Sequence, residues 1–207
     1  GSLSATVGVN IPDITFEGSF TLEFNNTLVA VNESMTVGGA TRTLNLPAGQ
    51  FLRVSGNNVK LNVLGQTLSG NFFIERYTNP VGDAYLRVGA SEVNLSITDG
   101  TSEILSISNG QGYFLMDGRG MAGQFSGNVA VSIPGVSLTG ALDVRINTIN
   151  ADINELFVIN TVETELVLPM GPYLRVEGKD LNLSIGGVNL KGNFAFQQRT
   201  LAGPDLT

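Results

Sequence analysis

Pro47 to Phe72, PAGQFLRVSGNNVKLNVLGQTLSGNF, is the stretch that decides the fold, because it returns later in the chain. Pro169 to Phe194 reads PMGPYLRVEGKDLNLSIGGVNLKGNF, and a shorter echo, YLRVGASEVNLSI, runs from Tyr85 to Ile97. A block that recurs within one chain predicts a repeat architecture, in which each unit buries its apolar face against its neighbours.

The region before this block repeats with the same spacing. Pro12 and Pro134 lie 122 positions apart, and the same shift pairs Gly18 with Gly140 without a gap. We therefore predict a first repeat unit over residues 3–122 and a second, incomplete unit over residues 123–207. Residues 1–2, Gly-Ser, are interpreted as a cloning scar.

Apolar residues alternate with polar ones ahead of the block. Ile14, Phe16, Phe20, Leu22 and Phe24 are separated by Thr, Glu and Ser, with Gly18 in the remaining apolar position. A period of two predicts a strand with one buried and one wet face, and no segment carries a helical period. The chain is therefore predicted to be all-β.

Short turn signals separate the apolar runs, among them Asn57-Asn58, Asp99-Gly100, Asn109-Gly110 and Asp117-Gly118. They predict about eleven strands per unit, with connections too short for parallel crossovers. The predicted fold is an antiparallel meander that forms an elongated β-solenoid or curled sheet and continues from one unit into the next. The alternative is two discrete β-sandwiches, one per unit, although no Pro/Gly/Ser-rich linker separates the copies.

Composition limits the chemistry. The chain of 207 residues is 42% hydrophobic and 14% charged, carries a net charge of −7, and lacks Cys, His and Trp. A negative chain is not expected to bind nucleic acid through a general electrostatic field, and no apolar run is long enough for a transmembrane helix. Without Cys or His, the commonest nucleophiles, bases and transition-metal ligands are missing. We expect no enzyme activity, no cofactor, and no catalytic, cofactor-binding or metal-binding residues.

Three arginines recur in the same Leu-Arg-Val context: Arg53, Arg87 and Arg175. They could contact an anion or a glycan. The favoured interpretation is pairing across the sheet with a carboxylate such as Glu75 or Glu177.

Two sets of acidic residues raise other hypotheses. Calcium ligands could come from Asp99, Glu103, Asp117, Asp152 and Glu155, but the EF-hand and nonapeptide patterns are absent, so turn formation is favoured. Asp13, Glu17 and Glu23 could form a catalytic set. The 122-residue shift replaces Glu17 with Thr139 and Glu23 with Arg145, which argues against it.

The string LRVxGxxVxLxVxGxxLxGxF, preceded by VxIPxVxxxGxF, resembles tandem repeats of giant bacterial surface or secreted proteins of the adhesin-like kind. That resemblance implies an extracellular structural or adhesive array. The short LxGxF strands also resemble AsmA/TamB-type β-groove proteins, whose curled sheets present an apolar groove.

Two functions are therefore expected. The first is a non-catalytic structural repeat of an extended extracellular or cell-surface protein, a stalk or fibre that associates with neighbouring repeats into a homo-oligomer or filament. The second is a lipid- or glycan-binding β-rich module with an apolar groove.

Overall fold

The computed structural model describes residues 1–78, 82–159 and 162–199, and none of them is helical. The final residues predicted for the second unit, 200–207, lie outside this range. The strands are β1 Ser2–Ile11, β2 Ile14–Asn25, β3 Val31–Val37, β4 Ala40–Leu46, β5 Gln50–Val63, β6 Gln66–Thr78, β7 Ala84–Thr98, β8 Glu103–Asp117, β9 Gly120–Ile133, β10 Val136–Asn147, β11 Ile153–Ile159, β12 Val162–Leu168, β13 Tyr173–Ile185 and β14 Val188–Arg199.

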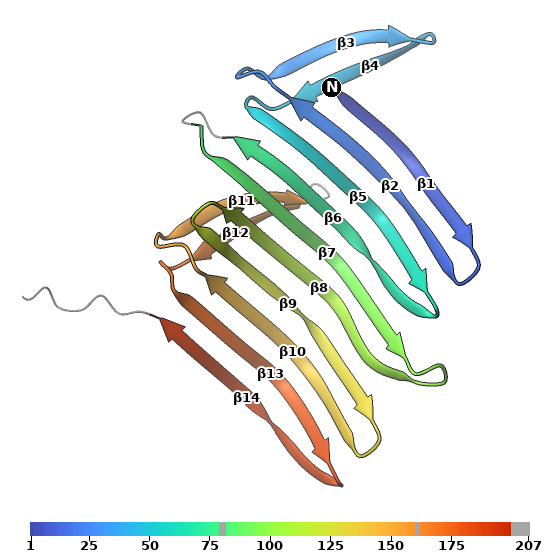
Figure 1. Cartoon of the computed structure of the whole chain (residues 1–207), viewed down its shortest axis with the longest axis vertical. Helices are drawn as coiled ribbons and strands as arrows, with labels where there is room; N and C mark the ends of the chain where they lie inside the picture. Colours follow the sequence, from blue (N-terminus) through green and yellow to red (C-terminus); the bar gives the residue numbers. More distant parts are fainter. Residues whose placement is uncertain (79–81, 160–161, 200–207) are drawn as a thin grey trace, which may run out of the picture.

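One ten-stranded antiparallel sheet dominates the molecule, in the order β1-β2-β5-β6-β7-β8-β9-β10-β13-β14 (Figure 1). Two hairpins, β3–β4 and β11–β12, leave this sheet between β2 and β5 and between β10 and β13. The predicted all-β antiparallel meander is confirmed. The alternative of two sandwiches is wrong, because one sheet contains strands from both halves of the chain. The described residues form neither a closed barrel nor a solenoid.

The predicted turns at Asn57-Asn58 and Asn109-Gly110 are wrong, because both pairs lie inside long strands, β5 and β8. Each is a β-bulge, where the strand register shifts and Asn58 and Asn109 adopt positive φ. An extra residue reverses the alternation, so the apolar residues before and after the bulge still point to one side. The described part of residues 3–122 therefore holds seven complete strands, β2 to β8, with nearly all of β1 and the start of β9, so the strands are fewer and longer than expected. The turns at Asp99-Gly100 and Asp117-Gly118 are confirmed.

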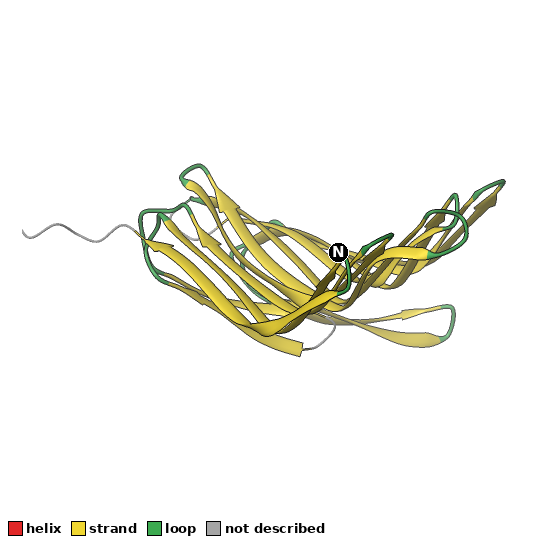
Figure 2. Ribbon diagram, turned by 90° about the horizontal axis from the view of Figure 1, so that it is seen from below, coloured by secondary structure: helices red, strands yellow, loops and turns green. Residues whose placement is uncertain are grey.

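The sheet has two chemically different faces. One, the apolar face, carries aligned aliphatic and aromatic side chains from strand to strand. A single row across it contains Leu3, Leu22, Val54, Ile74, Val88 and Phe114. The strands bend along their length, and both hairpins lie on the convex side of the sheet, which we call the hairpin face (Figure 2).

Hairpin β11–β12 covers part of the hairpin face and forms the main core with it. The inner side chains of the hairpin are Ile153, Phe157, Leu166 and Leu168, and all four are buried. They pack on residues of the sheet that include Phe73, Tyr113, Leu115, Ala122 and Tyr173. The ring centroids of Phe157 and Tyr113 are 5.7 Å apart. This core is on the face opposite the continuous apolar row.

Candidate interaction surface

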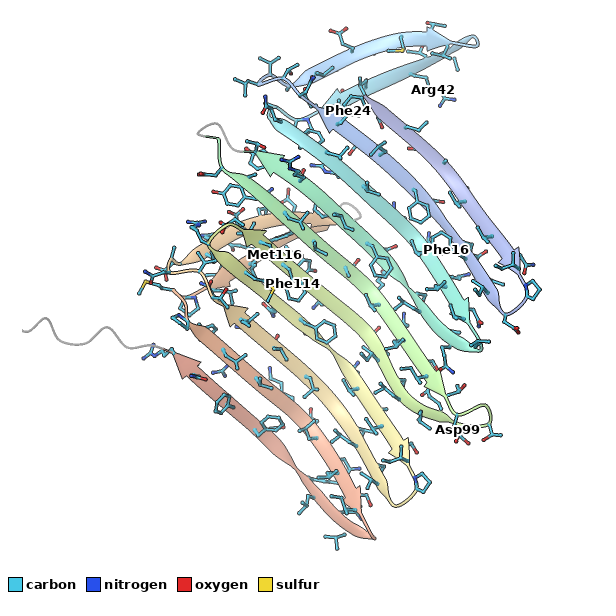
Figure 3. The ribbon with its side chains drawn as sticks, in the orientation of Figure 1. Phe16, Phe24, Arg42, Asp99, Phe114 and Met116 are labelled. Carbon is cyan, nitrogen blue, oxygen red and sulfur yellow. The ribbon has the colours of Figure 1, made fainter. Side chains whose placement is uncertain are left out.

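The apolar face remains uncovered by any described residue, although it extends over all ten strands. Figure 3 shows Phe16 on β2 and Phe114 on β8 among the side chains of the sheet. Exposed apolar side chains at its two margins include Val7, Val9, Ile11, Leu190, Phe194 and Phe196. A contiguous apolar patch of this extent marks an interaction site in a protein, because exposing it to water is unfavourable.

Glycines set the shape of this face, since aromatic rings fold over them. A Cβ on Gly56 would come within 2.9 Å of Phe20, and one on Gly178 would clash with Phe194. The glycine that follows Leu-Arg-Val-x in the sequence, Gly56 and Gly178, therefore has a packing reason. The ring on the neighbouring strand, Phe20 or Phe194, needs the space that a side chain would take.

The two outer strands offer a second kind of surface. β1 and β14 each pair with one neighbour only among the described residues. An edge strand presents unpaired N–H and C=O groups along its length, which can accept a further strand. Neither edge carries the proline that blunts strand addition within its paired residues Ser2–Ile11 or Val188–Arg199.

The recurring arginines lie on the hairpin face. Arg53 is aligned between Glu23 and Glu75 and forms ion pairs of 3.2 and 2.9 Å with them. Arg87 pairs with Glu75 at 3.4 Å and with Glu155 of the hairpin at 2.9 Å. The predicted pairing across the sheet is thus confirmed for these two arginines. Glu75 is buried, and burying an unpaired carboxylate would be costly, so Arg53 and Arg87 compensate its charge.

Arg175 differs from the other two. Its carboxylate partner, Glu177, lies two residues along the same strand at 3.1 Å. Its neighbours across the sheet are Arg145 on β10 and Gln197 on β14, and Gln197 accepts a hydrogen bond of 3.1 Å from Arg175. The hydrogen bond from Arg175 holds the pKa of Glu177 below its usual value. The prediction of Glu177 as partner is right, but its expected position on a neighbouring strand is wrong.

The acidic residues weighed as calcium ligands are dispersed. Asp99 accepts hydrogen bonds from Thr101 and Ser102 within its turn, and Asp117 pairs with Arg119. Asp152 accepts from the backbone N–H of Met170, and Glu155 pairs with Arg87. Among the described residues no group of three or more acidic side chains could hold a metal ion.

The residues weighed as a catalytic set do not converge. Glu17 pairs with Lys60 at 3.1 Å on an exposed surface, and Glu23 pairs with Arg53. A shallow hollow of about 610 Å³ over β1, β2, β5 and β6 includes Glu17 in its lining but neither Asp13 nor Glu23. The structure therefore gives these carboxylates separate surroundings.

Two buried asparagines were not predicted from the sequence. Asn147 donates from Nδ2 to the carbonyls of Ala151 and Pro169, at 2.9 and 2.8 Å, and accepts from the N–H of Ile149. These hydrogen bonds connect the segment that leads into hairpin β11–β12 with the segment that follows it. Asn25 makes the equivalent bonds at the base of β3–β4. The signal was present in the sequence, because Asn25 and Asn147 are 122 positions apart.

No described segment could cross a membrane as a helix. No family model, curated protein or solved structure matches the chain.

Proposed function

We propose that the chain is a non-catalytic structural module, built from a 122-residue unit, that extends a β-sheet from unit to unit in an elongated extracellular or cell-surface protein. The observation that carries the proposal is the position of the boundary between units. Residues 122 and 123 lie inside β9, which pairs with β8 on one side and with β10 on the other. A sheet that crosses the boundary within a strand makes a stiff junction, unlike two domains on a tether.

The strand bounds support the repeat. β10 begins at residue 136 and ends at 147, each 122 positions after the bounds of β2, and β11 and β12 follow β3 and β4 by the same interval. Side-chain bonds repeat as well. The backbone N–H of Asn58 donates to Asn71 Oδ1 at 2.9 Å, and that of Asp180 donates to Asn193 Oδ1 at 2.7 Å.

The open edges support extension. β1 is the counterpart of β9, so its outer edge corresponds to the edge of β9 that pairs with β8. β14 is the counterpart of β6, so its outer edge corresponds to the edge of β6 that pairs with β7. Each free edge therefore matches an edge that is already paired elsewhere in the molecule, and a further unit would continue the same meander. The extracellular setting rests only on composition and on the resemblance to surface repeats.

A longer chain tests this proposal. Residues 1–124 followed by residues 3–207 keep the repeat in phase, because Gln124 takes the place of Ser2. Each unit adds six strands to the sheet, so the maximum dimension from small-angle scattering should grow by about 29 Å, at roughly 4.8 Å per strand, less any shortening by twist. A scattering profile of two flexibly linked bodies would contradict the proposal.

A second candidate is binding of acyl chains along the apolar face. Its support is the uncovered apolar row that runs from β1 across the sheet. We expect a hydrophobic dye and a fatty acid to bind the folded monomer, and Val54→Asp, on the apolar face, to weaken both. Ser55→Asp, on the opposite face, is the matched control. Absence of binding to the folded monomer would exclude this candidate.

A further inference from the structure

Hairpin β11–β12 shows how a hairpin that leaves the sheet packs back onto it. It leaves the sheet between β10 and β13, yet β11 contacts β6 and β7, and β12 contacts β9 and β10. The hairpin thus reaches back over strands that precede its own exit point. Besides its four buried apolar side chains, it contributes Glu155, whose carboxylate pairs with Arg87 on β7. In terms of the proposed units, a hairpin of the second unit is docked on the sheet of the first.

Hairpin β3–β4 leaves the sheet in the same way. Asn25 bonds to the carbonyls of Val29 and Pro47, as Asn147 bonds to those of Ala151 and Pro169. With both ends held alike, β3–β4 points in the same direction as β11–β12 and projects past the free edge of β1 (Figure 1). No described strand of the sheet lies beyond β1 to receive it.

The inner side of β3–β4 is nevertheless equipped for docking. Val31, Met35, Leu44 and Leu46 occupy the positions of Ile153, Phe157, Leu166 and Leu168, 122 positions earlier. Met35 is 52% exposed whereas Phe157 is 1% exposed. Glu33 occupies the position of Glu155 and makes no ion pair among the described residues.

The outer side of the hairpin has a different character. Ser34 and Thr43 share a hydrogen bond of 3.3 Å there, and both are exposed. The hairpin is therefore amphipathic, and the only charged residues among its inner positions are Glu33 and Arg42, the latter replacing Thr164 near the tip (Figure 3).

We infer that β3–β4 is a clamp that docks onto the hairpin face of a preceding unit of the same kind. Its landing surface is the counterpart of the Phe73, Tyr113 and Leu115 surface, and Glu33 pairs there with the counterpart of Arg87. The inference rests on the proposed function and adds a second contact between units, separate from strand pairing. The internal docking of β11–β12 supplies the argument, because it is the same contact already made once within this chain.

Thiol labelling tests the clamp, since the protein has no cysteine of its own. The thiol introduced by Met35→Cys in the chain of 207 residues should react rapidly, because this side chain is exposed. In the second unit of the extended chain, residues 1–124 followed by 3–207, the same thiol should react at least about tenfold more slowly. Phe157→Cys, which replaces a core residue, should be protected in both chains, and Ser34→Cys, on the outer side, should react rapidly in both.

The ion pair gives a second readout. In the extended chain that carries Met35→Cys in its second unit, Glu33→Gln in that unit should speed labelling of the thiol about two- to fivefold, the effect of a partly exposed ion pair. Arg87→Gln in the first unit should produce the same change, and the two changes together should not add. Neither should alter labelling of the Met35→Cys variant of the chain of 207 residues.

The outcomes separate the two proposals. If the extended chain lengthens by the step expected for a continuous sheet while the introduced thiol still reacts rapidly, the clamp is overturned and the array stands. If the thiol is protected but Glu33→Gln and Arg87→Gln have no effect, the proposed ion pair between Glu33 and the counterpart of Arg87 is overturned. If the extended chain scatters as separate bodies and the thiol stays reactive, both proposals fail.

Discussion

At the scale of the residue, Asn147 connects the sheet to its covering hairpin. It is fully buried and satisfies two carbonyls and one N–H that no strand pairing reaches. Backbone groups buried without a partner are costly, so a residue with both a donor and an acceptor suits this position.

Asn147→Ala should therefore lower the free energy of unfolding by about 2–3 kcal/mol, since the buried N–H of Ile149 and the part-buried carbonyls of Ala151 and Pro169 lose their partner. Urea unfolding monitored by circular dichroism measures this loss. Asn32→Ala, on the exposed side of β3, is the control and should stay within about 0.5 kcal/mol of the wild type. An equally small effect of Asn147→Ala would mean that the hydrogen bonds of Asn147 do not contribute to stability.

Asp99 illustrates a turn residue whose ionisation contributes to stability. Hydrogen bonds from the backbone N–H groups of Ser102 and Thr101, and from the Thr101 hydroxyl, hold the pKa of Asp99 below its usual value of 3.8. A lowered folded-state pKa means that the stabilisation is complete above the unfolded-state value. It is lost as the pH falls below 3.8 toward the folded-state pKa.

Asp99→Asn keeps an acceptor oxygen but cannot titrate. We expect the wild type to have the higher Tm at pH 7, and the difference in Tm to shrink as the pH falls from about 4 to 2. Thermal unfolding at a series of pH values measures it. A difference that is constant over this range would show that the charge of Asp99 does not stabilise the turn.

At the scale of the element, close packing of rings on glycines limits what the strands tolerate. A Cβ on Gly123 would clash with the ring of Phe114 and lie 2.7 Å from the carbonyl oxygen of Tyr113. The backbone cannot yield without disturbing the pairing of β8 with β9. Gly8, by contrast, has no atom within 4 Å of the position of a Cβ.

Gly123→Ala should destabilise the protein by about 1–3 kcal/mol through overpacking. Gly8→Ala should be neutral or stabilise it slightly, because alanine restricts the unfolded chain. Chemical unfolding of both variants and of the wild type measures the two changes in the free energy of unfolding. Equal effects would show that the apolar face is loosely packed at this glycine.

The sequence predicted strands and their alternation well, but not where strands end. Asn58 adopts the positive φ that favours a turn, and it does so in a bulge. Bulge and turn place similar demands on one residue, and they differ in whether pairing resumes with the same neighbour. That information lies in the opposite strand, where Asn71 accepts the N–H of Asn58. A local pattern could not supply it.

The different burial of the two hairpins was also beyond the sequence. Met35 and Phe157 lie 122 positions apart in similar patterns, but a sheet lies beneath Phe157 and no described strand of the sheet lies beneath Met35. Burial here depends on neighbours far away in the chain. The arginine pairs Arg53–Glu75 and Arg87–Glu75 were predictable because the repeated Leu-Arg-Val context placed each arginine on the same face of its strand.

At the scale of the whole molecule, the sheet carries an apolar face on one side and a hairpin-covered face on the other. The sequence predicted a single apolar side and required that it be covered. The structure places the core on the opposite face, beneath β11–β12, and leaves the apolar row open. An open apolar face and two free edges are surfaces that can accommodate an apolar ligand or further strands, as the proposed functions require.

Hydrogen exchange at β1 in the extended chain tests the continuity of the sheet most directly. In the chain of 207 residues the outer edge of β1 has no described partner. In the second unit of the extended chain, we predict that the outward amides of Thr6 to Val9 exchange at least about tenfold more slowly, as β8 of the first unit pairs with this strand. Exchange at the same rate in both chains would contradict the account, because the units would then meet without sharing a sheet.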